Sequence, residues 1–449
     1  MSCIQTRPRT LTSWSSVAVA LILLAASNPV VAQVAPADVT ALLKASEVGD
    51  LQGLQAAEPG IKVPGLRALV DARLDAGRFD DAAAERDLKR YFASGDADPA
   101  RQAMAWSIAS DVAFAQGDYA AVAKASARWA ERLPSDDPQR QDANQSEAVA
   151  RALAGVPRQA IIASHPTPVA TRRDKVGLMT ADTLINGQPQ TMIVDTGASL
   201  SVLSMSTAKR LGVRLRDGAS IHSATRDVVP VKLGVADTME FAGFRLSNVV
   251  FLVLDDAQLQ GPRGYQIEAI IGFPVLRAMK RIGFTSGGRL APEPASSSRA
   301  KSVGELRVVG GSRLFVTARL GGAVTSLHLD TGATDSSLSA LFATRHPDVL
   351  AGLDHSKTGT ASVGGANVQD VAIWKAVPVE IAGRTMTLPT LPITISKMSG
   401  SDAKTIGAVG QDILGRFCSY TLDFQRATFE LGDPKGSRGC QPKVSRVGR

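Results

Sequence analysis

Residues 192–199 read Met-Ile-Val-Asp-Thr-Gly-Ala-Ser, and residues 327–334 read Leu-His-Leu-Asp-Thr-Gly-Ala-Thr. In both stretches a short, mainly apolar run leads into Asp-Thr-Gly-Ala, which places the aspartates at Asp195 and Asp330. Such a run predicts a strand, and the glycine predicts a turn directly after it. Two copies in the same context, one domain apart, indicate a duplicated half-site in which each half supplies one carboxylate.

The repeat continues downstream of each motif. Residues 269–276 read Ala-Ile-Ile-Gly-Phe-Pro-Val-Leu, and residues 408–414 read Ala-Val-Gly-Gln-Asp-Ile-Leu. The spacing from the aspartate to this glycine is nearly the same in the two copies, from Asp195 to Gly272 and from Asp330 to Gly410. A short helix-like segment follows each glycine, and we expect Asp412 to begin the second of these helices. The duplication therefore extends well beyond the two tripeptides.

The character of the sequence changes near residue 176. From there on, short β-branched runs alternate with Gly, Asn and Pro, which is typical of an all-β region, and Asn186-Gly187 predicts a hairpin. A Pro- and Ser-rich stretch at 291–303 has the composition of a linker. We therefore expect a linker at 161–175, one β-lobe at 176–290 and a second β-lobe at 304–440.

The region before these lobes, residues 33–160, is rich in Ala, Leu, Arg and Asp with helical spacing of its apolar residues. Gly-Arg-Phe-Asp-Asp-Ala at 77–82 recurs in similar form as Gly-Asp-Tyr-Ala-Ala-Val at 117–122. This pattern resembles the helical hairpin of tetratricopeptide repeats, and an irregular helical domain is the alternative. Under either interpretation Phe79 and Tyr119 are predicted to be core residues.

The N-terminus has the features of a signal peptide. Arg7 and Arg9 precede an apolar stretch at 17–26, and small residues lead to a cleavage site after Ala32. The apolar stretch is about half of the ~20 residues that a membrane-spanning helix needs, and no later segment looks transmembrane. We therefore expect residues 1–32 to be removed and the protein to be exported, either periplasmic or secreted.

Two cysteines, Cys418 and Cys440, remain once the signal peptide is removed. In an oxidising compartment such a pair can form a disulfide that stabilises the fold by roughly 2–4 kcal/mol. Two unrelated thiols, with Cys418 buried, are the alternative. Two cysteines are too few for a Cys-based zinc site, and the five histidines are scattered, so the sequence predicts neither a metal nor a cofactor.

The composition argues for a globular protein without a nucleic-acid partner. The chain of 449 residues is 44% hydrophobic and 20% charged, and its net charge is +8. Long Lys/Arg runs with interleaved aromatics are absent from the sequence, as are Gly-x-Ser-x-Gly, His-Glu-x-x-His and Walker-type motifs. Serine-hydrolase, zinc-protease and nucleotide-binding functions are therefore disfavoured.

The paired motifs resemble the retropepsin-like aspartic peptidases, specifically their exported bacterial relatives, over about residues 176–290 and 304–432. In that family each lobe supplies one Asp-Thr-Gly turn and a later hydrophobic-hydrophobic-Gly segment, which Ile270-Ile271-Gly272 and Ala408-Val409-Gly410 match. The resemblance implies both lobes in one chain, as in pepsin-like enzymes. The expected fold is multidomain α + all-β: a helical-hairpin repeat domain followed by a bilobed, β-barrel-like aspartic protease domain.

The resemblance also assigns roles around the two aspartates. It implies that the hydroxyls of Thr196 and Thr331 bond across to the opposite lobe, and that Gly197 and Gly332 let backbone amides approach the carboxylates. Ser199 is expected to support a carboxylate, whereas Thr334 with Asp335 is expected to contact substrate. His328 is interpreted as a strand residue, or as one with a modest influence on the aspartates.

Two carboxyl groups about 3 Å apart cannot both ionise, so they share a proton over a wide pH range. The ionised member can act as general base toward water while the protonated member donates to the scissile carbonyl oxygen. The family places a flap hairpin over this site in each lobe, expected here near 223–228 and near 362–366. Gly364 and Gly365 in the second flap are expected to contact substrate, and the first flap has no glycine, which argues against symmetric closing.

The sequence thus predicts an exported aspartic endopeptidase that acts on peptides or proteins, with a helical domain that docks partners or substrates. A catalytically idle scaffold that holds peptides, with the helical domain recruiting a partner, is the rival hypothesis. In a third hypothesis the helical domain covers the active site and inhibits it. Two intact aspartates favour the enzyme, because a peptide-holding scaffold has no need of both.

Overall fold

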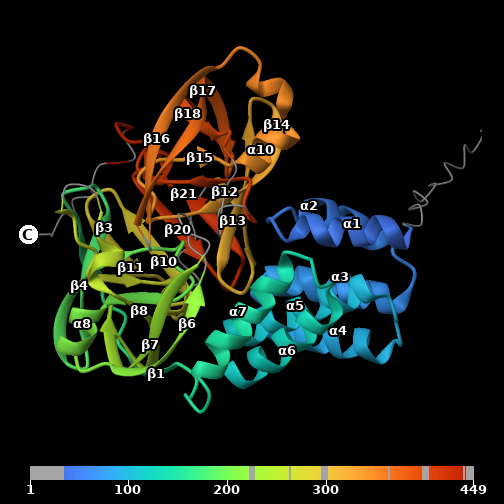
Figure 1. The fold of residues 1–449 in the computed structure, drawn as a ribbon. Helices are drawn as coiled ribbons and strands as arrows, with labels where there is room; N and C mark the ends of the chain where they lie inside the picture. Colours follow the sequence, from blue (N-terminus) through green and yellow to red (C-terminus); the bar gives the residue numbers. More distant parts are fainter. Residues whose placement is uncertain are drawn as a thin grey trace, which may run out of the picture.

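The computed structural model describes residues 35–221, 228–261, 264–294, 302–362, 365–396, 404–437 and 440. The predicted signal peptide at 1–32, nearly all of the predicted first flap at 223–228, and Gly364 lie outside these residues. Within the described ranges, no helix combines the length and the hydropathy needed to cross a bilayer. The chain forms an N-terminal group of helices followed by a large β-region (Figure 1).

The helical region consists of helices that pack as consecutive antiparallel neighbours. They are α1 (Pro36–Ser46), α2 (Gln52–Ala57), α3 (Pro64–Gly77), α4 (Asp81–Ala93), α5 (Pro99–Ala115), α6 (Tyr119–Arg132) and α7 (Gln139–Ala152), with a 3-10 turn at η1 (Glu58–Gly60). The two recurring Gly-containing motifs mark helix starts, because Asp80 and Asp118 accept hydrogen bonds from Ala83 N (2.9 Å) and Ala121 N (3.0 Å) as N-caps.

The two aromatic residues of these motifs have different surroundings. Tyr119 is buried, as predicted. Phe79 is only half-buried, and its ring contacts Phe424 of the β-region (centroids 5.5 Å apart) and the guanidinium of Arg277 (5.6 Å). Phe79 therefore packs against the hydrophobic core, as predicted, but the core that it meets is that of the β-region.

Each lobe has its own sheet. In lobe one the elements are β3 (Met179–Ile185), β4 (Gln188–Val194), β5 (Ser201–Ser204), α8 (Met205–Arg210), β6 (Arg214–Ile221), β7 (Val229–Phe241), β8 (Phe244–Leu254), η2 (Asp256–Leu259), β9 (Ala269–Ile271) and α9 (Phe273–Ala278). In lobe two they are β13 (Arg313–Leu320), β14 (Ala323–Leu329), β15 (Ser337–Leu338), α10 (Ala340–Arg345), η5 (Pro347–Leu350), β16 (Asp354–Ser362), β17 (Gly365–Ile381), β18 (Arg384–Thr394), β19 (Gly407–Val409) and α11 (Gln411–Leu414).

A further antiparallel sheet joins the lobes. Its strands follow the order β2 (Val169–Arg173), β11 (Arg289–Pro292), β10 (Arg281–Thr285), β20 (Ser419–Asp423), β21 (Thr428–Leu431) and β12 (Ser302–Val309). Strand β2, together with most of β1 (Ala160–Ser164), lies in the stretch 161–175 that was predicted to be a linker. These residues are ordered because their backbones pair with β11, β3 and β8.

Arg281 lies buried at the centre of this joining sheet, with 2% of its side chain exposed. Its guanidinium donates to Asp423 Oδ2 (2.8 Å) and to both carboxylate oxygens of Glu430 (2.9 and 2.8 Å). Arg281 follows lobe one, whereas both acceptors follow lobe two. The ion cluster therefore ties the strands of one half of the repeat to those of the other.

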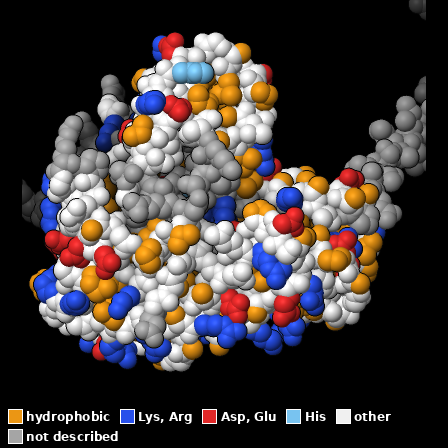
Figure 2. Space-filling model, in the orientation of Figure 1, with side chains coloured by type: hydrophobic (Ala, Val, Ile, Leu, Met, Phe, Trp, Pro, Cys, Tyr) orange, Lys and Arg blue, Asp and Glu red, His pale blue; other side chains and the backbone are white. Residues whose placement is uncertain are grey.

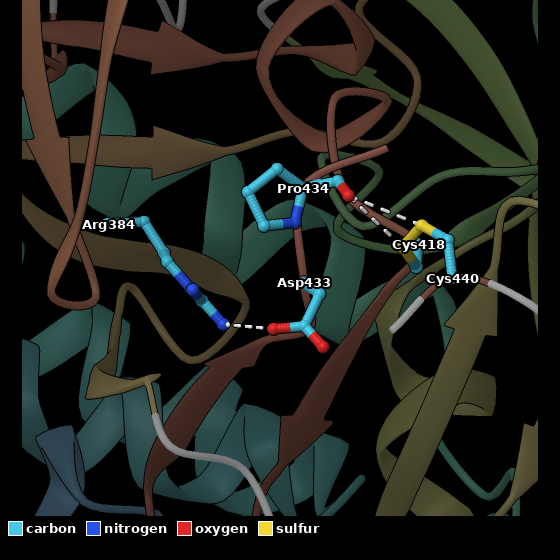
Figure 3. The surroundings of a disulfide bond; sticks show 5 residues. All are labelled: Arg384, Cys418, Asp433, Pro434 and Cys440. Atoms are coloured by element: carbon cyan, nitrogen blue, oxygen red, sulfur yellow. Dashed lines mark hydrogen bonds and ion pairs between the residues drawn. A yellow bond between two sulfur atoms is a disulfide. The ribbon is translucent and has the colours of Figure 1, made fainter. Parts of the chain in front are cut away.

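Cys418 and Cys440 form a disulfide, with Cα atoms 5.5 Å apart. Figure 3 shows that both sulfur atoms lie near the carbonyl oxygen of Pro434, at 3.5 and 3.3 Å. Beside them Arg384 Nη2 forms an ion pair with Asp433 at 3.1 Å. The disulfide and the ion pair attach the segment after β21 to lobe two.

The helical region shares apolar cores with both lobes. Val309 and Phe315 of lobe two belong to the core of helices α1–α5, and Leu233, Val235 and Val250 of lobe one belong to a cluster with α5, α6 and α7. Figure 1 shows the helices beside β6, β12 and β13. On the face in Figure 2, Lys and Arg are interspersed with Asp and Glu over the helices.

Candidate active site

The two Asp-Thr-Gly turns have the same position in their lobes. Strand β4 runs parallel to β9 and ends one residue before Asp195, whose amide donates to Ile271 O at 3.1 Å. Strand β14 runs parallel to β19 and ends one residue before Asp330, whose amide donates to Val409 O at 3.1 Å. Each aspartate therefore lies beside the hydrophobic-hydrophobic-Gly segment that the sequence repeat paired with it.

The two turns are joined by reciprocal hydrogen bonds through buried threonines. Thr196 Oγ1 donates to Leu329 O (2.8 Å) and accepts from Thr331 N (3.0 Å). Thr331 Oγ1 donates to Val194 O (2.9 Å) and accepts from Thr196 N (3.0 Å). Each hydroxyl both donates and accepts, so each fixes the backbone of the opposite turn. This is the arrangement that the resemblance implied.

The glycine that follows each Asp-Thr pair provides room for the carboxyl group of the other lobe. A Cβ atom added at Gly197 would lie 2.8 Å from Asp330 Cγ, and one added at Gly332 would lie 2.5 Å from Asp195 Cγ. The amides of the same glycines hold the carboxylates: Gly197 N donates to Asp195 Oδ1 (2.7 Å), and Gly332 N donates to Asp330 Oδ1 (2.8 Å). A larger residue at either position would displace the carboxyl pair.

Each carboxyl group lies against the glycine of the opposite turn, which brings the two groups close together, and two neighbouring carboxylates favour sharing one proton. Burial raises the pKa of Asp195 well above its ordinary value, and the neighbouring charge of Asp330 raises it further. The amide of Gly197 opposes this effect. Both aspartates remain partly exposed. The pair can therefore hold one proton and still be reached from solvent.

Two serines that the sequence analysis did not single out complete the symmetry. Ser201 Oγ accepts from Gly272 N (3.0 Å), and Ser336 Oγ accepts from Gly410 N (2.9 Å). The serines are separated by the same offset as the two aspartates, so the repeat itself contained the signal. Asp412, the second residue of α11, accepts from Ser336 Oγ at 2.6 Å and so extends this support in lobe two.

The remaining predicted site residues lie at the edges of the turns. Ser199 is exposed, and among the described residues the amides of Gly197 and Ala198, rather than the Ser199 hydroxyl, bond the Asp195 carboxylate. Thr334 and Asp335 are exposed and bond to one another (2.8 Å). Gly365 is the first residue of β17, in the second predicted flap.

His328 is a residue of strand β14, in register with Phe315 and Ala408. Its ring lies 5.9 Å from the Phe315 ring, on the side of the sheet that faces the helical region. Burial lowers the pKa of the imidazole, and the charge of Asp330 opposes this change. His328 is therefore a strand residue two positions before Asp330, at the start of the second Asp-Thr-Gly turn.

A polar relay from lobe one supports the turn of lobe two. Arg173 Nη2 donates to Gln411 Oε1 (2.6 Å), and Gln411 Nε2 donates to Thr331 O (2.9 Å). Neither residue was predicted from the sequence. The position of Gln411 is occupied by Phe273 after the corresponding glycine of lobe one, so this relay breaks the symmetry of the two turns.

One family model and one solved structure show what this chain is similar to. Residues 181–275 match a family model described as aspartyl protease. Among solved structures, a retropepsin-like aspartic protease from Rickettsia conorii is similar at 19% identity, with a TM-score of 0.20, over 30% of this chain and 89% of that chain. No curated protein matches the sequence. Among the described residues there is no group of His, Cys, Asp and Glu side chains suited to hold a metal ion.

The family match contains the first Asp-Thr-Gly turn and its partner segment Ile270-Ile271-Gly272, and the helical region lies outside it. The second turn reproduces the hydrogen bonds of the first. Lobe one of this chain is therefore similar to aspartyl proteases, and lobe two repeats the hydrogen bonds of its Asp-Thr-Gly turn within the same polypeptide.

Proposed function

We propose that the protein is an aspartic endopeptidase that hydrolyses peptide bonds with a water molecule activated between Asp195 and Asp330. The observation that carries the proposal is the pair of neighbouring carboxyl groups, whose turns are joined by reciprocal threonine bonds and which pack against the glycines of the opposite turns. Such a pair keeps one acid and one base side by side at the same pH.

The proton balance of the reaction follows from the shared proton. The ionised carboxylate removes a proton from water as the water oxygen attacks the scissile carbonyl carbon, while the protonated carboxyl donates to the carbonyl oxygen. The tetrahedral intermediate then collapses: the peptide nitrogen receives a proton from the carboxyl that took it from water, and the other carboxylate recovers its proton as the carbonyl re-forms. The pair ends with one proton, as it began, so no further reactant is required.

The rival hypothesis, an idle peptide-holding scaffold, does not account for the carboxyl pair. Burying two like-charged groups together is unfavourable unless one is neutralised, and a binding surface gains nothing from that arrangement. An enzyme does gain, because electrostatically unfavourable groups are retained where chemistry uses them. The substrate we propose is an extended peptide or protein segment, bound without a cofactor.

The location that we propose is supported by the N-terminal sequence pattern and the disulfide, and the partner that we propose is supported by the helical region. The signal-peptide pattern at 1–32 supports export to the periplasm or the exterior, and the Cys418–Cys440 disulfide fits an oxidising compartment. The helical region, which has charged residues of both signs on its outer face, is proposed to dock a protein partner or substrate.

The test is hydrolysis of a random peptide library by the mature protein, beside the Asp195→Asn and Asp330→Asn variants, with products identified by mass spectrometry. The proposal predicts cleaved peptides with the wild type only. Asn is nearly isosteric and removes one carboxylate, so both variants should stay folded by circular dichroism. An intact library with a folded wild-type protein, or equal cleavage by a folded variant, would reject the aspartic mechanism.

A further inference from the structure

The chain that follows each catalytic aspartate differs in exposure between the lobes. Leu200 and Asp335 occupy equivalent positions, five residues after Asp195 and Asp330. Asp335 is exposed, whereas Leu200 is only 5% exposed. Leu200 belongs to the apolar cluster that lobe one shares with the helices, whose helical members are Ala113, Tyr119, Val122, Ala150 and Leu153. Ser199 and Thr334, the residues before these, are both exposed, so the two turns diverge at this position: after Asp330 the chain stays in solvent, and after Asp195 it passes under the helical region.

The hairpin turns beside these positions differ in the same way. In lobe one the turn between β2 and β3 lies against the lobe-two catalytic turn. A Cβ atom added at Gly177 in this turn would lie 3.9 Å from the methyl carbon of Thr334. This turn is open, and Val176 in it is 42% exposed. By the symmetry of the repeat, we expect the equivalent turn between β12 and β13 to lie against the lobe-one catalytic turn. This turn contains Gly311 and Ser312, and both are buried.

Helix α5 covers the β12–β13 turn directly. Asp111 Oδ2 accepts from Gly310 N at 3.2 Å, and a Cβ atom at Gly311 would lie 2.6 Å from Asp111 O and 3.2 Å from the Phe114 ring. The backbone of the turn thus touches the helix with no space for a side chain or a peptide between them. Phe114 also packs against the cluster that contains Leu200.

Charged groups hold this cover in place. Arg73 of α3 forms an ion pair with Asp111 (3.2 Å), with only 3% of the arginine side chain exposed. Arg313, at the end of the same turn, donates to the carbonyl oxygens of Glu47 (3.4 Å) and Lys404 (3.2 Å). Lys404 pairs with Asp142 of α7 at 2.6 Å. Since these groups are largely desolvated, separating the helices from lobe two would leave charges unpaired.

Helix α7 holds lobe one at a second place. Arg216 of β6 donates to the carbonyl oxygens of Ala152 (3.4 Å) and Ala154 (3.1 Å), where a cation is favoured by the helix C-terminus. Gln145 Nε2 donates to Ser220 O on the same strand at 2.7 Å. The helices therefore contact both lobes through several hydrogen bonds and ion pairs.

We infer that the helical region closes the lobe-one end of the substrate path, meaning the line along which a bound peptide passes the two aspartates. The lobe-two end, beside Thr334, Asp335 and the turn at 174–177, stays open. The enzyme then accepts a long chain on one side of the scissile bond and only a few residues on the other. Its substrates carry a chain terminus close to the cleaved bond, and the short product always comes from the same terminus. This inference rests on the proposed peptidase function.

The test uses a peptide that the wild-type protein cleaves, lengthened by a Gly-Ser segment at its N-terminus in one version and at its C-terminus in another. Extension toward the closed end should lower kcat/KM by roughly 100-fold or more, because displacing a substrate from its reactive geometry lowers the rate by about that factor. Extension toward the open end should change kcat/KM little. A head-to-tail cyclised version of the same peptide should not be cleaved.

Equal tolerance of both extensions, or cleavage of the cyclic peptide, would overturn the closed end and leave the peptidase function standing. Failure to cleave any peptide would instead reject the proposed function itself. A charge reversal locates the open end: Lys175→Glu, exposed in the open turn, should alter the preference for charged residues in the long product. Lys124→Glu on α6 makes the same change of net charge and should not alter that preference.

Discussion

The two lobes are alike where they hold the aspartates and unlike where they meet the rest of the chain. Thr196 and Thr331 exchange the same hydrogen bonds, and Ser201 and Ser336 support the same glycine amides. Five residues after each aspartate the likeness ends, with Leu200 under the helices and Asp335 in solvent. Apart from the relay of Arg173 and Gln411 to Thr331, symmetry is kept around the two carboxyl groups, and it is lost five residues farther along the chain.

Removing the helical region, residues 35–159, tests this difference most severely. The deletion would expose the apolar cluster around Leu233, Val235 and Val250, together with Phe315 of lobe two. We expect the remaining β-region to lose cooperative unfolding and to aggregate, because exposed apolar surface of this kind favours association. Differential scanning calorimetry and light scattering of the truncated protein check this. A soluble, cooperatively folded β-region would show that the helices are an independent unit.

Replacing Arg281 by Ala tests the joint between the lobes. The change leaves the buried carboxylates of Asp423 and Glu430 without this partner, so the free energy of unfolding should fall by about 3–5 kcal/mol. Chemical denaturation measures this. The matched control is Lys375→Ala, which breaks the exposed ion pair with Asp354 on lobe two and should leave the transition unchanged. Equal effects of the two variants would contradict the role of the joint.

Replacing Thr196 or Thr331 by Val tests the symmetry of the turns. Each change keeps the size of the side chain but leaves a buried amide and a buried carbonyl without a partner, at a cost of roughly 1–3 kcal/mol. We expect similar losses of stability and of kcat/KM from the two variants, and Thr→Ser at each position should restore most of both. A large loss from only one of them would show that the turns are not equivalent.

The Asp195→Asn variant should change the dependence of stability on pH. The pKa of Asp195 is raised in the folded protein. The neutral form of Asp195 therefore contributes its full stability below the unfolded pKa of about 3.9, and this stability is lost as the pH rises through the raised pKa. An Asn side chain does not titrate, so the variant does not lose stability in this way. The variant should therefore gain melting temperature over the wild type at neutral pH and lose that advantage in acid, and an advantage independent of pH would contradict the assignment.

Much of the site could be predicted from the sequence because the duplication repeats it. The offset that pairs the two aspartates also pairs Ser201 with Ser336, although the serines were recognised only in the structure. The relay from Arg173 to Gln411 was not predictable, because the two residues lie far apart in the sequence and neither has a local signature. Such contacts arise only when the lobes assemble.

The covered end of the substrate path had a weak signal in the sequence. Leu200 is apolar where the repeat has Asp335, which marks a position that is buried in one lobe and exposed in the other. The sequence did not predict which residues bury Leu200. Helical periodicity at 33–160 shows that helices form, but it does not show which lobe they pack on. The strands inside 161–175 were missed for a related reason, because most of their side chains are exposed and only their backbones are paired.

In the proposed mechanism Asp195 and Asp330 act as one unit that holds a single proton. This is tested by kcat/KM against pH for a cleaved peptide, with the wild type and the folded Asp330→Asn variant. We expect a bell-shaped profile for the wild type, falling at high pH as the raised pKa of Asp195 is passed and falling in acid as the pair takes a second proton. We expect negligible activity of the variant at every pH, and a variant that retains the wild-type profile would contradict the shared-proton mechanism.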